Sequence, residues 1–550
     1  MHNLGKAIAL GILVVLGIAG AAERSIAHAG ERAALAAQLA AGKATPVPAG
    51  TALSLDGLRY LADPGSRIIP DLPGWTPVLP ASPEHFGAVG DGRDETALLS
   101  AVFGTGNVRL PEGKTYGFRK LHVPSGAIVT NAGAVLRYVG GETDEPVLIL
   151  SEGVTWDRLL YRAAGRATTG APSILVEARV RLGVLDLEAD TQDDASVVQV
   201  VGDGVEIGHL RSRRFGRPFS VHNPDRRIDG FRLGWFDLEN ITRGIRLRMV
   251  SNFEIGGGRQ AYRSPLTPSE RPGRNNILMS GVTNGRFGPM DLADAPEHAV
   301  RFGGGGQGGA HRMISENITF APMTIRRQGA SAIKLNPNYQ GRVRDVHFGQ
   351  LTLVDPFQEI GESAKASHLI RVSHADDITF DGGKVLKGEA ASSGAEPGVI
   401  FAIADSIGVE FGPFEIACCA RELAAFVEDL DSVGTEEYGD IRDITFRGIS
   451  VTQPGALPGA PIRFKTCNIA TDEIRFEGLD LPSLHKQNLI KFPECDTEYG
   501  ALRLEGQVGN VGAGTFRRMP SELDLTVDLT TDGGLRAVGA PDALQRQLAP

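Results

Sequence analysis

The chain has 550 residues, more than one compact core usually holds, so several domains or one extended repeat are expected. Its 70 glycines, 32 prolines, 6% aromatic and 42% hydrophobic residues fit a soluble chain of strands and tight turns and exclude a disordered one. A formal charge of -10 argues against a nucleic-acid binder, so no nucleic-acid partner is expected.

Residues 1–29 are interpreted as a signal peptide or N-terminal anchor. One lysine in MHNLGK precedes an apolar run from Ala7 to Ala22, and small-residue sites follow at Ala19 to Ala21 and at Ala27 to Ala29. The run is short for a membrane span of about 20 residues, which favours a signal peptide. The predicted location is periplasmic or extracellular, with membrane contact only through this segment if it stays uncleaved.

Residues 30–84 are expected to form a leader or cap with a short helix. The alanine-rich ERAALAAQLAAG ends at a glycine, and the sequence that follows is interrupted repeatedly by proline and glycine. A linker and cap is favoured over a trimerisation or attachment module.

A recognisable signature begins at residue 85. It comprises Phe86 to Gly92, the acidic Asp94 and Glu95 before the helix ETALLSAVF, and the strand-turn VRLPEGKTY. These pieces resemble the amino-terminal signature of the pectate-lyase-like superfamily, which implies a right-handed parallel β-helix. The superfamily includes lyases, hydrolases, epimerases and phage tailspikes, so the resemblance leaves the activity open. Asp94 is expected to cap the helix, and Asp91 to have a turn role.

Two strand types alternate along residues 85–510. One type includes GIRLRM, AVRFGG, AIKLNP and LIRVSH, and the other includes NITFAPMTI, DVHFGQLTL and DITFDGGKV. Successive strands of the second type start 28, 32, 31, 35 and 30 residues apart, as in a solenoid. The predicted fold class is all-β, a right-handed parallel β-helix with a short N-terminal capping helix. Residues 511–550 are expected to be a C-terminal cap strand and tail.

In each strand of the first type, one residue between two core positions should point outward. In chain order these residues are Gln199, Ser220, Arg246, Arg301, Lys334, Arg371, Phe401, Arg463 and Lys491. Four consecutive members from Arg246 would form a basic ladder, unless residues 252–290 add a coil. An anionic ligand would offset its repulsion, so Arg246, Arg301 and Arg371 are predicted to bind substrate. The alternative is a solvated face whose positive charges are balanced by acidic residues of the flanking loops.

The loop GPMDLADAPEH places Asp291, Asp294, Glu297 and His298 just before the Arg301 strand. Carboxylates, an imidazole and cations around a groove suit acid–base cleavage of a sugar chain. Asp291, Asp294 and His298 are therefore candidate catalytic residues, with turn or surface roles as the alternative for the acids. His368 precedes Arg371 as His298 precedes Arg301, which makes stacking of the two plausible, and a structural role is favoured for His368.

A second, partial resemblance concerns polygalacturonase-type glycoside hydrolases. His298 to Gly303, and then Ile333 and Lys334, look like the Gly-His-Gly and Arg-Ile-Lys segments of that family. The match implies that His298 assists catalytic acids and that Lys334 holds a substrate carboxylate. The sequence departs from the family at Ala332, which replaces the arginine, and in TRGIRLRMVSN, which lacks the paired aspartates.

Lyase chemistry needs fewer groups. A base removes the proton beside a uronate carboxylate, a cation stabilises the resulting charge, and the glycosidic oxygen leaves. Arg301, Lys334 or Arg371 could neutralise the carboxylate or act as the base, with His298 as another base. Ca²⁺ could use Asp291 and Asp294, although two acids do not identify a site. Zinc-spaced Cys/His clusters, phosphate-binding loops and nucleophile elbows are absent from the sequence, and no cofactor is assigned.

The cysteines predict one disulfide. Cys467 follows Arg463 by four residues and Cys495 follows Lys491 by four, so the two occupy the same register in neighbouring coils. A Cys467–Cys495 bond agrees with export. Cys418 and Cys419 are expected to remain buried thiols, with a vicinal bond as the alternative.

The sequence therefore predicts an exported β-helix protein that binds and cleaves an acidic polysaccharide, by β-elimination or hydrolysis. One alternative is a non-catalytic, tailspike-like attachment protein, which would be expected to form a homotrimer. Another is a polysaccharide epimerase, which shares proton abstraction but leaves the chain length unchanged.

Overall fold

The computed structural model describes residues 31–538 except 43–46, 164–170, 263–273, 304–312, 338–340, 358–367, 389–397, 428–438, 454–456, 458, 466, 468–469, 483, 485–487, 494–498, 510–515, 518–522 and 532–535. The chain forms two compact units, Met1–Asp186 and Leu187–Pro550. Each unit is described by itself below.

The first unit begins with the alanine-rich helix α2 (Glu31–Ala40). A small antiparallel sheet follows, made of β1 (Ala52–Leu55), β2 (Leu58–Ala62) and β3 (Trp75–Pro77). A 3₁₀ turn, η1 (Pro83–Phe86), leads into β4 (Asp91–Asp94) and the helix α3 (Thr96–Phe103). Leu99, Val102 and Phe103 of α3 are buried, so this helix covers apolar surface of its unit.

The signature that begins at residue 85 is held by one buried carboxylate. Glu95, 3% exposed, accepts hydrogen bonds from the backbone N–H groups of Val89 at 2.6 Å and Gly90 at 3.2 Å. Gly90 has φ 69°, in the left-handed region that favours glycine. Asp94, which we expected to cap α3, accepts hydrogen bonds from the N–H and hydroxyl groups of Thr96, the first residue of the helix.

Parallel coils complete the first unit. Their strands are β5 (Asn107–Leu110), β6 (Thr115–Phe118), β7 (Leu121–Val123), β8 (Ile128–Asn131), β9 (Val135–Tyr138), β10 (Leu148–Leu150), β11 (Thr155–Ala163) and β12 (Ile174–Val176). Three columns of parallel pairs run through them: β7 with β10 and β12, β5 with β8 and β11, and β4 with β6 and β9. The strand β13 (Arg181–Val200) contains the boundary between the units.

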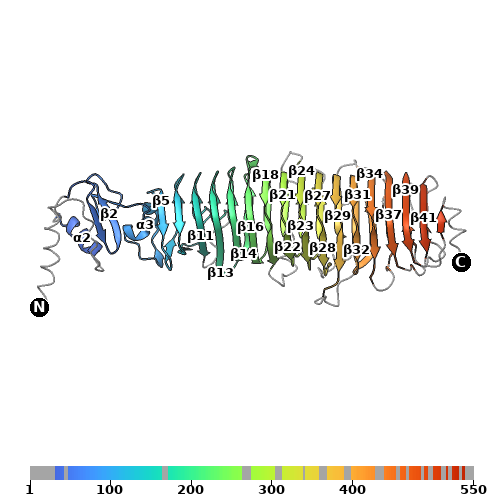
Figure 1. The fold of residues 1–550 in the computed structure, drawn as a ribbon, viewed down its shortest axis with the longest axis horizontal. Coiled ribbons are helices and arrows are strands. Elements are labelled where there is room, and N and C mark those ends of the chain that lie inside the picture. Colours follow the sequence, from blue (N-terminus) through green and yellow to red (C-terminus); the bar gives the residue numbers. More distant parts are fainter. Residues whose placement is uncertain are drawn as a thin grey trace. The chain divides into compact units, whose positions relative to one another are not determined.

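The second unit has three parallel sheets, called here sheets A, B and C, and each coil contributes a strand to each (Figure 1). Sheet A contains β17 (Ile245–Arg248), β20 (Ile277–Ser280), β23 (Val300–Gly303), β26 (Ile333–Asn336), β33 (Ala420–Val427), β36 (Ile462–Lys465), β38 (Ile490–Lys491) and β40 (Phe516–Arg517). The first parts of β29 (His368–Phe380) and β31 (Gly398–Phe411) also belong to sheet A, as does the end of β14 (Glu206–His222).

Sheet B contains β15 (Ile228–Asp229), β18 (Val250–Ile255), β21 (Thr283–Phe287), β24 (Met313–Phe320), β27 (Gly341–Phe348), β34 (Ile441–Arg447), β37 (Thr471–Leu481), β39 (Ala501–Val508) and β41 (Asp524–Thr531). Sheet C contains β19 (Gly258–Tyr262), β22 (Met290–Ala293), β25 (Met323–Arg326), β28 (Leu351–Val354), β30 (Gly383–Leu386), β32 (Phe414–Ile416) and β35 (Ile449–Val451). The strand β16 (Arg232–Ile241) passes from sheet B into sheet C. At the C-terminal end, β42 (Arg536–Val538) pairs antiparallel with β41.

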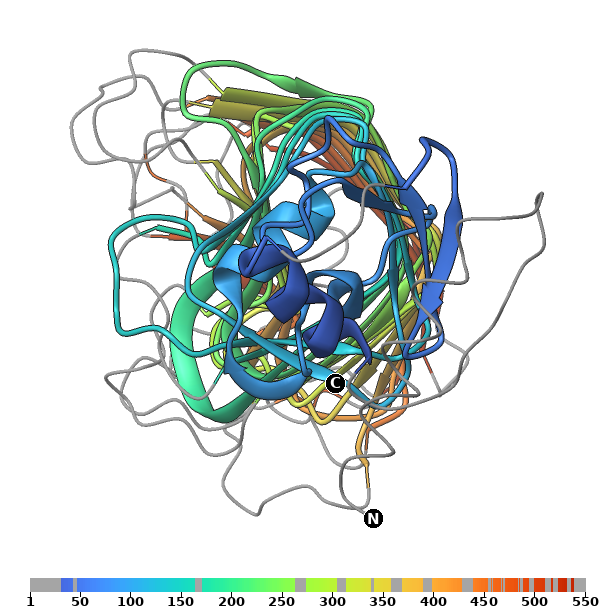
Figure 2. The same cartoon turned by 90° about the vertical axis from the view of Figure 1, so that its left-hand side faces the viewer.

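The core of the second unit is a stack of phenylalanine rings on the inner face of sheet B. Neighbouring rings lie 4.5 to 4.9 Å apart with planes 5 to 7° from parallel. The stack consists of Phe287, Phe320, Phe348, Phe380, Phe411, Phe446 and Phe476. From Phe320 onward, each ring comes from the second strand type of the sequence repeat. Strands of successive coils overlie one another on the sides of the solenoid (Figure 2). The predicted right-handed parallel β-helix is confirmed.

Candidate functional site

Three cationic residues form a continuous row on the outer face of sheet A. Arg301 of β23 is in register with Lys334 of β26, and Lys334 with Arg371 of β29. Adjacent parallel strands lie about 4.8 Å apart, so the side chains leave the sheet at that spacing. Arg301, Lys334 and Arg371 are called the basic row below.

The predicted ladder does not continue unbroken to Arg246. Residues 252–290 do add a coil, and its sheet A strand β20 places Leu278 between Arg246 and Arg301. The exception stated for the ladder therefore applies, and the four cations are not consecutive. Arg246 lies two strands from Arg301, about 9.6 Å at the usual spacing.

The row also ends differently from the prediction at its other end. Arg371 is in register with Ala402, not with Phe401, which pairs with the inward-facing Ile370. A further strand, β33, places Ala425 beside Ala402 before the cations resume at Arg463 and Lys491. Phe401 was assigned outward because apolar residues flank it on both sides, which leaves the alternation ambiguous.

Glu297 and His298 sit at the edge of the basic row. A carboxylate oxygen of Glu297 lies 3.2 Å from Nη1 of Arg301 and 3.5 Å from Nε2 of His298. Burial alone would raise the pKa of Glu297, but the hydrogen bond from His298 and the charges of His298, Arg301 and Lys334 lower it to about 2. Glu297 is therefore ionised at neutral pH.

His298 is 4% exposed, and both of its ring nitrogens are engaged. Nδ1 accepts a hydrogen bond from the backbone N–H of Ser331 at 3.1 Å, so this nitrogen carries the lone pair and Nε2 carries the proton that faces Glu297. Burial lowers the pKa of His298 to about 4, against the opposing pull of Glu297. A neutral His298 in this arrangement orients Glu297 and has no lone pair left for a substrate proton.

Asp291 and Asp294 are paired with arginines of the following coil. Asp291 lies on β22 and contacts Nη1 of Arg326 at 2.8 Å. Asp294 follows β22 and accepts two hydrogen bonds from Arg327, at 2.7 and 2.8 Å. These contacts tie sheet C coils together, and within the described residues the carboxylate that meets His298 is that of Glu297. A catalytic role for the two aspartates stays a prediction.

Metal ligation receives no support from the described part of the chain. Among those residues, no group of three or more His, Cys, Asp or Glu side chains is arranged to hold a metal ion. Both carboxylates considered for Ca²⁺, Asp291 and Asp294, hold guanidinium groups instead.

His368 does not stack directly on His298. Ser331 occupies the register position between them, one coil from each, as the backbone hydrogen bonds from Ala299 to Ser331 and from Ala332 to Leu369 show. Burial lowers the pKa of His368 to about 3, and the nearby charges of Arg371, Lys465 and Lys334 act in the same direction. His368 is thus a neutral histidine at the start of β29, three residues before Arg371.

Two asparagines that lie beside His298 were not identified from the sequence. Asn275 and Asn276 precede β20, are 3% and 0% exposed, and the N–H of Asn276 donates to the carbonyl of His298 at 3.2 Å. The coil TRGIRLRMVSN is the one that the sequence pattern aligns with the hydrolase segment carrying paired aspartates. Because β20 lies between that coil and β23, the neighbouring coil carries amides where hydrolysis would require carboxyl groups.

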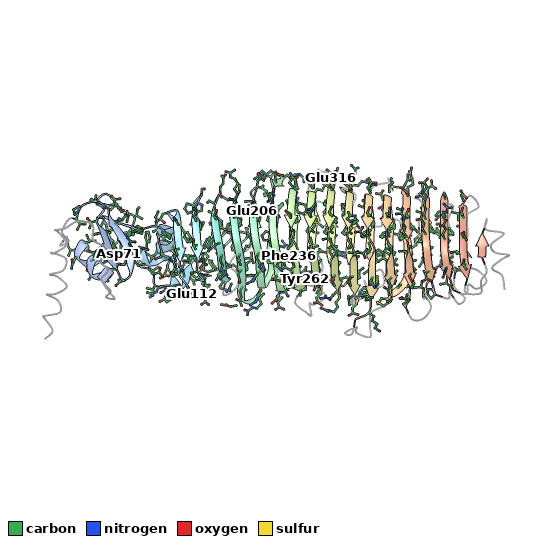
Figure 3. All side chains as sticks on the ribbon, in the orientation of Figure 1. Asp71, Glu112, Glu206, Phe236, Tyr262 and Glu316 are labelled. Atoms are coloured by element: carbon green, nitrogen blue, oxygen red, sulfur yellow. A yellow bond between two sulfur atoms is a disulfide. The ribbon has the colours of Figure 1, made fainter. Side chains whose placement is uncertain are left out.

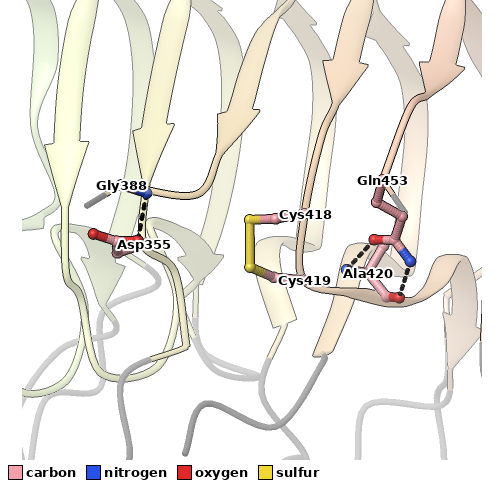
Figure 4. The surroundings of a disulfide bond; sticks show 6 residues. All are labelled: Asp355, Gly388, Cys418, Cys419, Ala420 and Gln453. Atoms are coloured by element: carbon pink, nitrogen blue, oxygen red, sulfur yellow. Dashed lines mark hydrogen bonds between the residues drawn. A yellow bond between two sulfur atoms is a disulfide. The ribbon is translucent and has the colours of Figure 1, made fainter. Parts of the chain in front are cut away.

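The cysteines differ in part from the prediction. Cys418 and Cys419 form a vicinal disulfide, so the expected thiols are absent (Figure 4). Gln453 of the next coil holds the adjoining Ala420 through two hydrogen bonds, at 2.9 and 3.1 Å. Cys467 is also disulfide-bonded. Its predicted partner Cys495 lies outside the described residues, and the pairing stays a prediction.

No helix among the described residues is long and apolar enough to cross a membrane. Residues 1–29, predicted to be a signal peptide or anchor, lie outside the described residues.

No protein-family model matches the sequence, and no curated protein matches it. Among solved structures, the A-module of a mannuronan C-5 epimerase from Azotobacter vinelandii is similar, with 12% identity and a TM-score of 0.30 over 82% of this chain and 98% of the other. A family 28 exopolygalacturonase from Yersinia enterocolitica is similar with 12% identity and a TM-score of 0.26, over 85% of this chain and 80% of the other. Likenesses at this level do not carry an activity from either protein to this chain.

Proposed function

We propose that sheet A binds an acidic polysaccharide and cleaves it by β-elimination at the basic row. The observation that carries the proposal is the register of Arg301, Lys334 and Arg371 on adjacent strands. Like charges about 4.8 Å apart repel one another, and a polymer with repeated carboxylates would offset that repulsion. A polyanion lying along the coils would meet one cation at each coil.

The three cations suit different parts of the reaction. Arg301 and Arg371 are proposed to hold the uronate carboxylate, because a planar guanidinium donates two parallel hydrogen bonds to it. Lys334, between them, is proposed as the base, because a lysine amine can give up its proton whereas an arginine guanidinium stays protonated in proteins. The C–H bond beside the carboxylate breaks, a C=C bond forms, and the glycosidic oxygen leaves with the electron pair and takes up a proton.

Hydrolysis has less support from the same contacts. It requires a carboxylic acid that still holds a proton at the working pH. Glu297, with a pKa of about 2, has lost its proton, and Nδ1 and Nε2 of His298 are both engaged. Asn275 and Asn276 in the adjoining coil present amides.

The test is incubation of the purified mature chain with a panel of acidic polysaccharides, following chain length, reducing ends and the ultraviolet absorbance of unsaturated uronate. Absorbance that rises with reducing ends is expected, and Lys334→Ala should lower the rate by about 100-fold or more. Lys384→Ala is the matched control, because this lysine lies on sheet C in an ion pair with Glu415 and should not affect the rate.

Other outcomes would favour the remaining readings. Reducing ends without absorbance would indicate hydrolysis and return attention to Asp291 and Asp294. Binding without cleavage would favour an attachment protein if sedimentation shows a trimer, or an epimerase if the sugar stereochemistry changes at constant chain length. Export to the periplasm or the exterior belongs to the same proposal, since such polymers lie outside the cytoplasm.

A further inference from the structure

A second group of cations lies on sheet A beyond Leu278. Arg246 and Arg248 of β17 are two residues apart and leave the same face of the strand, in register with Ser220 and His222 of β14. Arg217 precedes Ser220 by three residues, as Arg243 precedes Arg246. Arg217, Arg243, Arg246 and Arg248 are called the arginine cluster.

The members of the cluster are close enough to act on one another. Burial lowers the pKa of Arg217 to about 10, and the charges of Arg243, Arg246 and Arg274 add to the effect. Burial and the charges of Arg248 and Arg243 lower the pKa of Arg246. His222 responds in the same way: burial, Arg248 and Arg246 lower its pKa to about 4.

Within the described residues, no carboxylate pairs with three members of the cluster. Arg217, Arg246 and Arg248 form no ion pair there, and Nε of Arg248 is buried with no hydrogen-bond partner among those residues. Burial raises the pKa of the Tyr262 phenol, labelled in Figure 3, so this group carries no negative charge at neutral pH that could offset Arg217.

Three other partly buried arginines of this unit hold carboxylates. Arg327 holds Asp294 through two hydrogen bonds, Arg342 holds Asp376 at 2.5 Å, and Arg463 holds the buried Glu422 at 2.8 Å. Partly buried guanidinium groups without a counter-charge are costly, and an oxyanion would supply both the charge and the acceptors.

We propose that the arginine cluster is a separate oxyanion site that takes a carboxylate or sulfate group of the polysaccharide. This assignment rests on the proposed function of sheet A. The apolar Leu278 separates Arg246 from Arg301, so the two sites lie about 9.6 Å apart at the usual strand spacing. The cluster would therefore bind an anionic group further along the same chain from the one held at the basic row, and would favour polymers with charges at that interval.

Isothermal titration of the full mature chain with sodium sulfate at constant ionic strength tests the site. One saturable site is expected, and the double variant Arg246→Gln, Arg248→Gln should weaken it by about tenfold or more, through loss of charge-assisted hydrogen bonds. The control Arg286→Gln removes an exposed arginine from sheet B and should leave sulfate affinity unchanged. Thermal melting without sulfate checks folding, and the double variant should melt no lower than the wild type because it relieves repulsion.

A second titration separates this proposal from the proposed function. Lys334→Ala should keep sulfate binding and lose cleavage of the acidic polysaccharide, whereas the double variant should weaken the binding of both sulfate and polysaccharide. Sulfate bound through Arg246 and Arg248 with no polysaccharide bound by the wild type would leave the oxyanion site standing and overturn the polysaccharide function. Unchanged sulfate affinity in the double variant, or no saturable sulfate binding in the wild type, would overturn the oxyanion site. The function proposed for the basic row would then be tested separately by the cleavage rate of Lys334→Ala.

Discussion

The backbone N–H of Ser331 donates a hydrogen bond to Nδ1 of His298 at 3.1 Å, from the coil that carries Lys334. This contact fixes the tautomer of His298 and directs its Nε2 proton toward Glu297, 3.5 Å away. Glu297 in turn contacts Arg301. A chain of contacts from one coil thus determines how a cation of the neighbouring coil is held on the outer face of sheet A.

His298 is expected to act as a positioning residue. His298→Gln should keep a donor toward Glu297 and retain most of the cleavage rate, whereas His298→Ala should lower it by about tenfold by releasing Glu297 and Arg301. The pH profile distinguishes the roles, because a positioning residue leaves the pH dependence of the rate unchanged. If His298→Gln were as inactive as His298→Ala and the profile lost a limb, His298 would be the base.

Acid should destabilise the second unit through His298 and His368. Their folded pKa values are about 4 and about 3, against 6.5 for an ordinary histidine. Between pH 6.5 and these folded pKa values, the unfolded chain binds more protons than the folded one. The stability that the two neutral histidines contribute is therefore complete above pH 6.5 and is lost as the pH falls toward their folded pKa values. Each histidine accounts for about 1.4 kcal/mol per pH unit in that window.

Melting curves between pH 7 and pH 4 measure this effect, and His368→Gln should reduce the steepness of the fall. His347→Gln is the control, because His347 is only half-buried on β27, beside the exposed Asp381. Equal slopes for the wild type and His368→Gln would show that folding does not lower the pKa of His368.

The fold could be predicted from the sequence where the residue type marked the repeat, and not where it left the register ambiguous. The phenylalanine at the same place in each strand of the second type, such as Phe320 and Phe348, identified the repeat because such a ring stacks on its neighbour. The coil of Leu278 was uncertain because a leucine stands where neighbouring coils have a cation. Ala402 was missed because Phe401 and Ala402 are both apolar, and alternation cannot then fix the register.

The candidate site was less predictable than the fold. Arg301, Lys334 and Arg371 could be aligned because each lies between two apolar core residues of its strand. The partners of Asp291 and Asp294, by contrast, come from the following coil, and sequence spacing does not show which cation reaches which carboxylate. Asn275 and Asn276 carry no charge signal, so only the added coil brings them to His298.

The stacked rings of sheet B should be sensitive to truncation in the middle of the stack. Phe348 lies between Phe320 and Phe380 at 4.7 Å from each and is fully buried. Phe348→Ala should cost about 3–5 kcal/mol, and Phe348→Leu less, because the leucine fills part of the cavity. Ile407→Ala is the control, since Ile407 is 38% exposed. Equal melting points for Phe348→Ala and Ile407→Ala would contradict a packed stack.

Thiol counting in denaturant tests the cysteine pairing. The chain has four cysteines, and two disulfides predict no free thiol before reduction and four afterwards. Cys495→Ala should release one free thiol at Cys467, whereas an unchanged count would exclude the predicted Cys467–Cys495 bond. Two free thiols in the Cys495→Ala, Cys467→Ala double variant would show that Cys418 and Cys419 are reduced in the purified protein.

The ion pair between Asp294 and Arg327 separates a structural from a catalytic role for this acid. Asp294→Asn keeps the shape of the side chain and removes the charge that accepts two hydrogen bonds, so a loss of about 1 kcal/mol in stability is expected for this half-buried pair. The cleavage rate should be unchanged, because the pair joins two coils and lies apart from the contacts of the basic row. Asp381→Asn, on an exposed aspartate, is the matched control for melting and rate. A fall of about 100-fold in rate with an unchanged melting point would instead assign Asp294 to catalysis.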